Sequence, residues 1–235
     1  MLQPGGIRIV SVTPRRGYNT VKLRDLPGVL QQPDILLHTR RFLYRLEQPD
    51  GDVDNTGVEE LPYLWKGRQV SVFHNASATF YAPSEHAGPN GMHREMIRCT
   101  PSWFGGGGRY DTVLVSTGDH AVGIDGMTVA RVRAFISFIH DGVLHRCALV
   151  EWFIVDDEAP DEVTGMWVVR PEVDAEGERV MDIIAIETVV RACHLIGVYG
   201  TTFIPPDFDF VDSLDAFERY YVNWYADYHA HEIIV

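Results

Sequence analysis

The sequence predicts an α+β protein that is mainly β, with an antiparallel β-barrel core flanked by an N-terminal and a C-terminal helix. Short runs of alternating apolar and polar residues fill the middle of the chain, and Gly, Pro and Asp turn residues separate them. Apolar residues at three-to-four spacing, which is typical of a helix, occur near the two ends. Short strands in series with helices outside them indicate a small barrel or sandwich.

We expect two parts, residues 1–60 and a β-rich domain over residues 61–235 whose core spans 109–204. The first thirty residues are rich in Gly and Pro and are expected to form an irregular, extended lead-in. A helix follows it. Pro33-Asp34 suits the start of this helix, and Pro49 ends it.

The polar face of this first helix is basic. It carries Arg40, Arg41 and Arg45 beside His38. Such a stripe can bind nucleic acid, but a solvated amphipathic face is the favoured interpretation.

Strands are expected wherever the period is two. They lie over 68–82 (one strand, or two with a bend), 110–116, 127–139, 143–155, 166–170, 180–184 and 193–199, with a short helical turn at 186–192. His140-Asp141-Gly142 joins two of these strands into the clearest unit of the chain. Asp-Gly supplies the positive φ that a tight hairpin turn needs.

The last helix is expected to begin at the N-cap Ser213 and to run into the tail YADYHAHEIIV, because apolar residues keep three-to-four spacing up to Tyr228. In a strand, Asp227, His229 and His231 would share one face and could bind a metal. In a helix only Asp227 and His231 are neighbours. The helix is favoured, so the tail is interpreted as a docked element with an Asp227–His231 pair.

The net charge of the chain is −13 and its distribution is uneven. Residues 1–47 hold eight Arg or Lys against three Asp or Glu, and the remaining residues hold 12 against 30. An acidic body repels phosphate backbones and suits a basic protein partner such as a histone tail. Charge that only maintains solubility is the plainer interpretation.

No coherent active site is visible, so an enzyme is not expected, and neither is a cofactor. Gly105 to Gly108 precede a strand and not a helix, which is wrong for a phosphate loop. No G-x-S-x-G elbow occurs. Cys147 and Cys193 lie in apolar strand patterns and are interpreted as core residues.

Aromatic residues on the strands are the remaining candidate. Tyr110, Trp152, Phe153 and Trp167 belong to neighbouring strand segments of an acidic body, and aromatic rings beside carboxylates form methyl-lysine cages. A barrel core also needs large aromatic residues, and that is the plainer interpretation.

Location and membrane contact follow from composition. No apolar run approaches the roughly 18–20 residues of a membrane span, and the N-terminus lacks the layout of a secretory signal. The three cysteines form no disulfide pattern. We therefore expect an intracellular protein, nuclear or cytoplasmic, without membrane contact.

Long stretches over residues 20–235 resemble the C-terminal region of proteins encoded by basidiomycete DNA transposons, the Plavaka and related KDZ-like elements of the CACTA kind. The matching stretches are LPYLWKGRQVSVFHNASATFYAPSEHAGPNGMHREMIRCTPSW, ARVRAFISF, CALVEWF, TGMWVVRPEVD, HLIGVYG and SLDAFERYYVNWYADYHAHEI. That region follows the catalytic part in such proteins. The resemblance therefore implies a non-catalytic, accessory part.

Residues 109–200 also resemble bromo-adjacent homology (BAH) domains in the order of their features. The D-x-V-x-V strand is matched at 111–115, the A-R-V strand at 130–132 and the aromatic V-x-W-F strand at 150–153, while 186–195 approximate the last motif. Ile154-Val155-Asp156 stand where those domains have Arg-Pro, and this puts the partner surface in doubt.

These observations favour a non-catalytic chromatin- or protein-binding module of a fungal transposon protein, with a histone tail or a transposase as partner. Two alternatives stay open. One is a metal-dependent enzyme that uses the tail cluster with His74, His86 or His93 as distant ligands. The other is a DNA-binding accessory domain. Its candidate residues are Arg8, Arg15, Arg16, Arg40, Arg41 and Arg45.

Overall fold

A computed structural model of the chain gives the fold. It describes residues 9–14, 18–65, 67–82, 91–118, 123–156, 158–201, 203–204 and 206–234, and of residues 9–19 it describes the backbone only. Arg8, Arg15 and Arg16, named as candidate DNA-binding residues, and His86, named as a candidate metal ligand, lie outside these residues.

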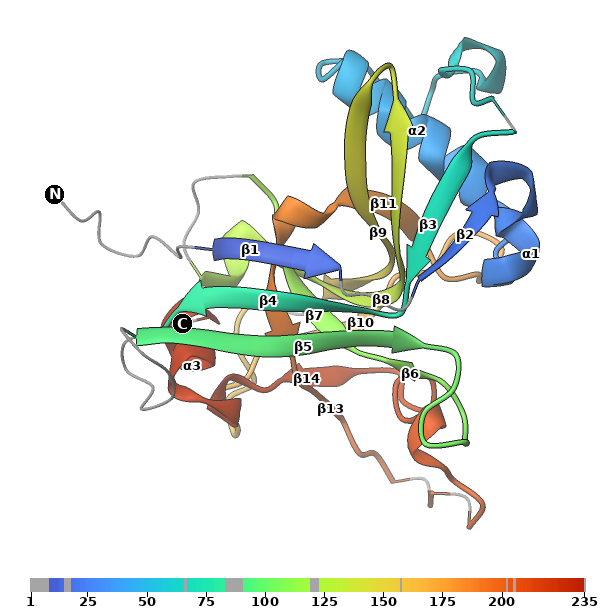
Figure 1. Cartoon of the computed structure of the whole chain (residues 1–235). Helices are drawn as coiled ribbons and strands as arrows, with labels where there is room; N and C mark the ends of the chain where they lie inside the picture. The colour runs from blue at the N-terminus through green and yellow to red at the C-terminus, as the bar shows by residue number, and fades with distance from the viewer. Residues whose placement is uncertain are drawn as a thin grey trace, which may run out of the picture.

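The chain is mainly β, as predicted, and its larger antiparallel sheet curls into a half-barrel. The smaller sheet has the order β1-β4-β5-β6, and Figure 1 shows β1, β4 and β5 side by side as one layer. Its strands are β1 (Ile9–Pro14), β4 (Asn75–Tyr81), β5 (Met92–Thr100) and β6 (Arg109–Tyr110).

The larger sheet has the order β12-β7-β8-β9-β10-β14-β13, with β11 paired to β9, β3 paired to β8, and β2 paired to β3. Its strands are β2 (Tyr18–Lys22), β3 (Gln69–Phe73), β7 (Thr112–Ser116), β8 (Met127–His140), β9 (Val143–Val155), β10 (Val168–Pro171), β11 (Met181–Ala185), β12 (Val189–Cys193), β13 (Leu195–Gly197) and β14 (Tyr220–Val222). The break at His74 between β3 and β4 confirms the bend expected in 68–82.

The β8–β9 hairpin forms as its turn residues predict. Asp141 and Gly142 both have positive φ, 49° and 79°, which is the pair of left-handed residues that a two-residue hairpin turn needs. The two strands pair from His140↔Val143 down to Val129↔Phe153. One irregularity, between Val132 and Ala134, interrupts the ladder.

The predicted N-terminal helix is confirmed as α2 (Ile35–Glu47). Its buried face, with Ile35, Phe42 and Leu43, packs on the outer end of the β8–β9 hairpin and on β11. Figure 1 shows α2 and α1 (Leu26–Leu30) at this end of the molecule, away from α3 (Tyr228–Ile234).

The expectation of an irregular lead-in is wrong. β1, β2, a 3-10 turn at Leu23–Asp25 and α1 lie in these residues. The Gly and Pro residues predicted irregular backbone, but pairing with distant strands outweighs that preference. β1 forms its hydrogen bonds with β4, and β2 forms its hydrogen bonds with β3. β1 and β2, which belong to the 1–60 part, thus share sheets with strands of the 61–235 part.

The single helix expected from Ser213 is also wrong. Residues 210–234 form a 3-10 turn at Phe210–Asp212, then β14, a 3-10 turn at Trp224–Ala226, and α3. Tyr220 and Val222 are fully buried and alternate with the half-buried Tyr221. β14 pairs with β10 and β13, and this sheet pairing outweighs the helical spacing.

Residues 186–192 were expected to form a helical turn. Only Ile186–Thr188 is 3-10, and the rest is β12. Further 3-10 turns lie at Val58–Glu60 and Gly123–Gly126.

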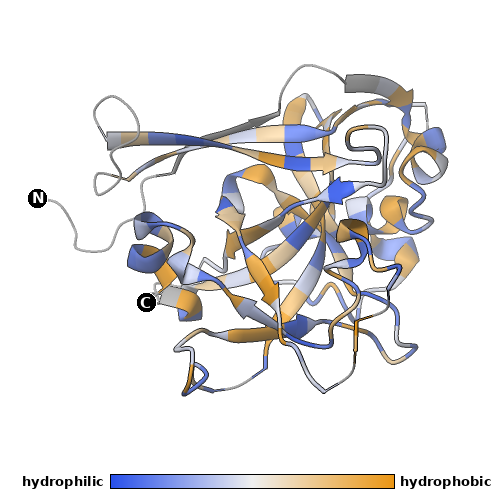
Figure 2. Ribbon diagram, turned by 90° about the horizontal axis from the view of Figure 1, so that it is seen from below, coloured by the Kyte–Doolittle hydropathy of each residue, from blue (hydrophilic) through white to orange (hydrophobic). Residues whose placement is uncertain are grey.

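Buried apolar side chains form three clusters. Figure 2 shows hydrophobic residues, in orange, along the strands in the middle of the fold. The first lies between the two sheets and contains Phe80 and Val132. The second lies under α2. The third lies on the opposite face of the larger sheet from the first, where Phe153 and Tyr220 pack with α3. No helix among the described residues is long and apolar enough to cross a membrane.

The hairpin turn allows a test of the fold. Because Gly142 has positive φ and a Cβ there meets nothing within 4 Å, Gly142→Ala adds only backbone strain and should lower the free energy of unfolding by about 1 kcal/mol. Gly28→Ala, in α1 and equally open, should leave stability unchanged or raise it slightly. Urea unfolding of both variants measures this, and equal effects would contradict the turn geometry.

Candidate functional site

The candidate site is a cavity of about 460 Å³ between the β5–β7 region, β12 and the C-terminal residues. We refer to it as the central cavity. Its walls include Met96, Tyr110, Arg131, Arg191, Leu214 and Ala230. Segments that are far apart in the sequence therefore build the cavity. Its lining combines guanidinium groups with apolar side chains.

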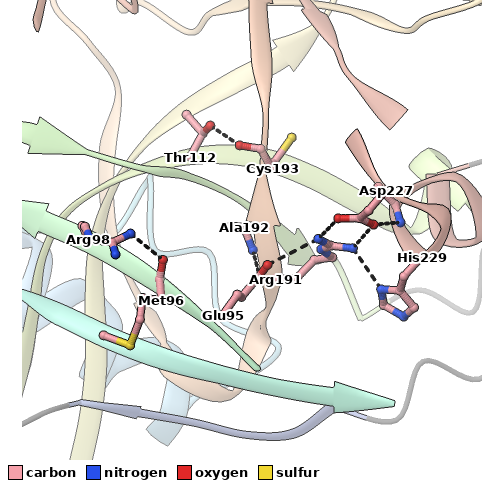
Figure 3. Close-up of polar contacts among 10 residues, drawn as sticks. Glu95, Met96, Arg98, Thr112, Arg191, Ala192, Cys193, Asp227 and His229 are labelled. Atoms are coloured by element: carbon pink, nitrogen blue, oxygen red, sulfur yellow. Dashed lines mark hydrogen bonds and ion pairs between the residues drawn. The ribbon is translucent and has the colours of Figure 1, made fainter. Parts of the chain in front are cut away.

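Arg191 on β12 is the hub of the polar contacts at this cavity (Figure 3). Its side chain is only 5% exposed. Nη1 donates to Asp227 Oδ1 at 2.8 Å and Nη2 donates to Oδ2 at 2.6 Å, the two-pronged geometry in which Arg binds a carboxylate most strongly. Asp227 Oδ1 also accepts from the backbone N–H of Ala230 at 2.7 Å and so caps α3.

Glu95 on β5 is the second carboxylate at Arg191. Its Oε2 lies 3.3 Å from Arg191 Nη2, and its Oε1 accepts the backbone N–H of Ala192 at 2.5 Å. Burial raises the pKa of Glu95 although Arg191 acts in the other direction. The contact joins the smaller sheet to β12.

His229 completes the hub. It is 2% exposed, its ring stacks on Phe80 at 4.5 Å, and its Nδ1 lies 3.1 Å from Arg191 Nη1. Arg can only donate, so Nδ1 accepts and the neutral ring carries its proton on Nε2. Burial and then the charge of Arg191 lower the pKa of His229 to about 4.

The expected Asp227–His231 pair is not what the structure shows. Asp227 precedes α3 instead of lying within it, and its carboxylate binds Arg191. His229 shares that partner, whereas His231 is exposed and makes an edge contact with Trp224. The pairing was wrong because it assumed one helix through residue 227.

The tail residues do not converge as metal ligands either. Among the described residues, the three-membered group of possible ligands that the geometry allows is Glu47, His140 and Asp141, not the tail. His229 has Nδ1 turned to Arg191, and its Nε2 carries the proton, so neither nitrogen offers a free lone pair.

The Glu47–His140–Asp141 group is an unsuitable metal site for the same reason. His140 Nε2 lies 3.6 Å from Glu47 and 3.7 Å from Asp141, while Arg68 Nη1 lies 3.1 Å from Nδ1. Because Arg68 donates to Nδ1, the neutral ring must carry its proton on Nε2, towards the two carboxylates. This nitrogen is a hydrogen-bond donor there and not a metal ligand.

The cysteines are not reactive groups. Burial raises the pKa of Cys99 and of Cys193 to about 12, and it raises that of Cys147 further. Thiolates are the nucleophilic form, so these thiols are inert at neutral pH. This agrees with their interpretation as core residues.

The four aromatic residues proposed as a cage are divided between two core clusters. Tyr110 and Trp152 pack against the cluster between the sheets, while Phe153, 1% exposed, and Trp167 pack with the cluster on the opposite face. Of the four, Tyr110 lines the central cavity. The structure does not bring them together around one opening.

The basic face of α2 is largely used for internal contacts. Arg40 donates to the carbonyls of Val58, Leu61 and Pro62 at 2.5–2.9 Å. Arg45 binds Asp182, and Arg41 is half-buried.

A second pocket, of about 560 Å³, was missed in the sequence. We refer to it as the aromatic pocket. Its walls include four aromatic rings and two charged residues: Tyr199, Phe203, Phe208, Phe217, Glu218 and Arg219. Phe203 is 90% exposed and Tyr199 is 56% exposed, which is unusual for large rings. A signal was present, because acidic and aromatic residues alternate in Asp207-Phe208-Asp209-Phe210, just before the helix that was expected from Ser213.

No protein-family model matches this chain, and no curated protein matches it.

The lowered pKa of His229 predicts the pH dependence of stability. The unfolded state binds the proton below about pH 6.5 and the folded state only below about pH 4, so stability is complete above pH 6.5 and falls on acidification between these values. The loss should reach about 2–3 kcal/mol at pH 4.

His229→Phe keeps a ring on Phe80 and should remove this part of the pH dependence in urea unfolding from pH 7 to pH 4. His231→Phe, at an exposed position of the same helix, is the matched control and should retain it. The raised pKa of Glu95 acts in the opposite direction in all three proteins, so the comparison cancels it. Parallel curves for both variants would contradict the buried, neutral His229.

Proposed function

We propose that the protein is a non-catalytic binding module of a fungal transposon-encoded protein, and that its aromatic pocket receives a basic protein segment, with a lysine-rich histone tail as the first candidate. The observation that carries the proposal is the exposed ring set of this pocket, at a segment with five carboxylates between residues 207 and 218. A nuclear or cytoplasmic location is part of the proposal.

The rings of the pocket suit a cation, and the guanidinium of Arg219, which also lines the wall, is paired with Asp156 at 3.6 Å. An ammonium group is attracted to the faces of aromatic rings, and methylated lysines are recognised in this way. Phe208 and Phe217 meet edge to face at 6.3 Å, and Phe217 lies over Gly197, where a Cβ would come within 2.4 Å of its ring. These contacts hold one wall of the pocket, while Phe203 and Tyr199 stay exposed to a ligand.

Charge supports the same class of partner. A net charge of −13 attracts basic segments over a distance and repels nucleic acid. A basic segment of a transposase has the same chemistry as a histone tail, so both belong to the proposed class.

We further propose that the curled sheet is a BAH-like barrel. The motifs that resemble those domains lie on β7, β8 and β9, which are consecutive neighbours in the larger sheet. The resemblance is one of fold, and fold alone does not assign function.

The two alternatives gain less support. A tail-based metalloenzyme requires free imidazole nitrogens, and those of His229 are used. DNA binding through α2 requires free guanidinium groups, and those of Arg40 and Arg45 hold internal partners.

Peptide binding tests the proposal. Fluorescence anisotropy with labelled histone-tail peptides, unmodified and trimethylated, should show saturable binding that weakens as salt is added. Phe203→Ala removes an exposed ring and should weaken binding about fivefold, which corresponds to the roughly 1 kcal/mol of one cation–π contact.

Phe104→Ala is the matched control. Phe104 is 93% exposed and does not line the aromatic pocket, so its removal should leave the affinity unchanged. Equal losses in both variants, or no binding by the wild type, would refute the assignment of the pocket. A basic transposase segment tested in the same assay decides between the two partners.

A further inference from the structure

Arg131 on β8 is a buried guanidinium that lies in the wall of the central cavity. Its side chain is 6% exposed, yet the residue lines the cavity. Its Nε is buried without a hydrogen-bond partner among the described residues. Buried polar groups in native proteins are nearly always paired, so Arg131 keeps donor capacity that no described group uses.

Asp215 is the carboxylate closest to Arg131, and it binds only one nitrogen of the guanidinium. Both oxygens of Asp215 bind the same atom, Nη1, at 2.9 and 2.8 Å. A guanidinium presents pairs of parallel N–H donors that match the two oxygens of a carboxylate or a phosphate. Asp215 does not use such a pair, so a better-placed oxyanion can make the stronger contact.

The surroundings of Arg131 carry an excess of positive charge. Arg131 Nη1 and Arg179 Nη2 each lie 3.7 Å from Glu151 Oε2, and Arg133 Nε lies 3.5 Å from Glu151 Oε1. These separations are too long for good hydrogen bonds. Burial lowers the pKa of Arg179, which shows that the available carboxylates do not fully compensate its desolvation. The guanidinium groups of Arg131, Arg133 and Arg179 face only two carboxylates in these contacts, Glu151 and Asp215. One positive charge of the group is therefore not balanced.

The position of Asp215 allows another anion to replace it at Arg131. Its side chain is 54% exposed, in contrast to the buried arginine that it binds. The two residues before it, Ser213 and Leu214, belong to the cavity wall.

We propose that Arg131 is the anchor of an oxyanion-binding site in the central cavity, and that Asp215 occupies this site as an internal carboxylate until a carboxylate or phosphate group of a ligand displaces it. Arg133 and Arg179 supply the additional positive charge. Tyr110, over whose ring the Cζ atoms of Arg131 and Arg133 lie at 5.5 and 4.1 Å, fixes their orientation. The site is lined by different residues from the aromatic pocket and does not depend on the proposed function.

Calorimetric titration with inorganic phosphate and with acetate tests the site on the full chain at constant ionic strength. Asp215→Asn keeps the shape of the side chain and removes the competing charge, so phosphate should bind about tenfold more tightly than to the wild type. A gain for phosphate alone identifies a phosphorylated ligand, and an equal gain for acetate shows that the site also accepts a carboxylate.

Asp207→Asn is the control, because it removes the same charge from the same exposed segment without touching Arg131. It should bind phosphate as the wild type does. If all three proteins bind phosphate equally, or if none binds it, Asp215–Arg131 is a structural ion pair only and the proposal is wrong.

A second measurement remains valid if Asp215→Asn fails to fold. The Nε–Hε resonance of Arg131 in the wild type, assigned by its loss in Arg131→Lys, should shift during a phosphate titration, because the unused Nε is a donor to the ligand. The corresponding resonance of Arg40, which already donates to Pro62, should stay in place. A stationary Arg131 resonance overturns the proposal.

Discussion

The β8–β9 ladder is the constraint on which the other elements depend. In the half of the ladder away from the hairpin turn, one face packs in the cluster between the sheets and the other packs in the cluster with α3. The half next to the turn packs against α2. The irregularity between Val132 and Ala134 shifts the alternation by one residue. Ala130 and Val132 face the space between the sheets before it, and Phe135 does so after it. Arg131 and Arg133 are two residues apart on β8 and both lie close to Glu151, at 3.7 and 3.5 Å.

Two buried arginines of the larger sheet hold the C-terminal residues in the same way. Arg131 binds Asp215 and Arg191 binds Asp227, and in each pair the arginine is nearly inaccessible while the carboxylate is partly exposed. Loss of the carboxylate leaves the buried guanidinium desolvated and destabilises the fold, and solvent screening weakens this effect for the exposed Asp215. The pairs differ in quality, since Asp227 uses two nitrogens of its partner and Asp215 uses one. One pair is therefore suited to permanent attachment and the other to exchange.

The features that could be predicted from the sequence are those with a local cause. The hairpin turn follows from Asp141-Gly142, and α2 follows from its apolar period and its prolines. The C-terminal helix failed because three-to-four spacing and the alternation of Tyr220 and Val222 coexist in one stretch, and only the neighbouring strands decide between them. The contacts of Arg191 could not be predicted from the sequence, since no local pattern specifies which carboxylate a buried guanidinium will bind. The alternating acidic and aromatic residues at 207–210 were visible in the sequence, but nothing local shows that their rings border a pocket.

Residues 189–197 raise the entropy cost of folding, because they pair with strands that are distant in the sequence. β12 pairs with β7, β13 pairs with β14, and only His194 separates them, so one short stretch meets both ends of the larger sheet. The hairpin fixes neighbours in sequence and closes a minimal loop, whereas this stretch must bring together residues as distant as Thr112, Cys193 and Val222. Loop-closure entropy grows with such separations, and folds that need them form slowly. The curl of the sheet is thus a long-range property that no part of the sequence specifies alone.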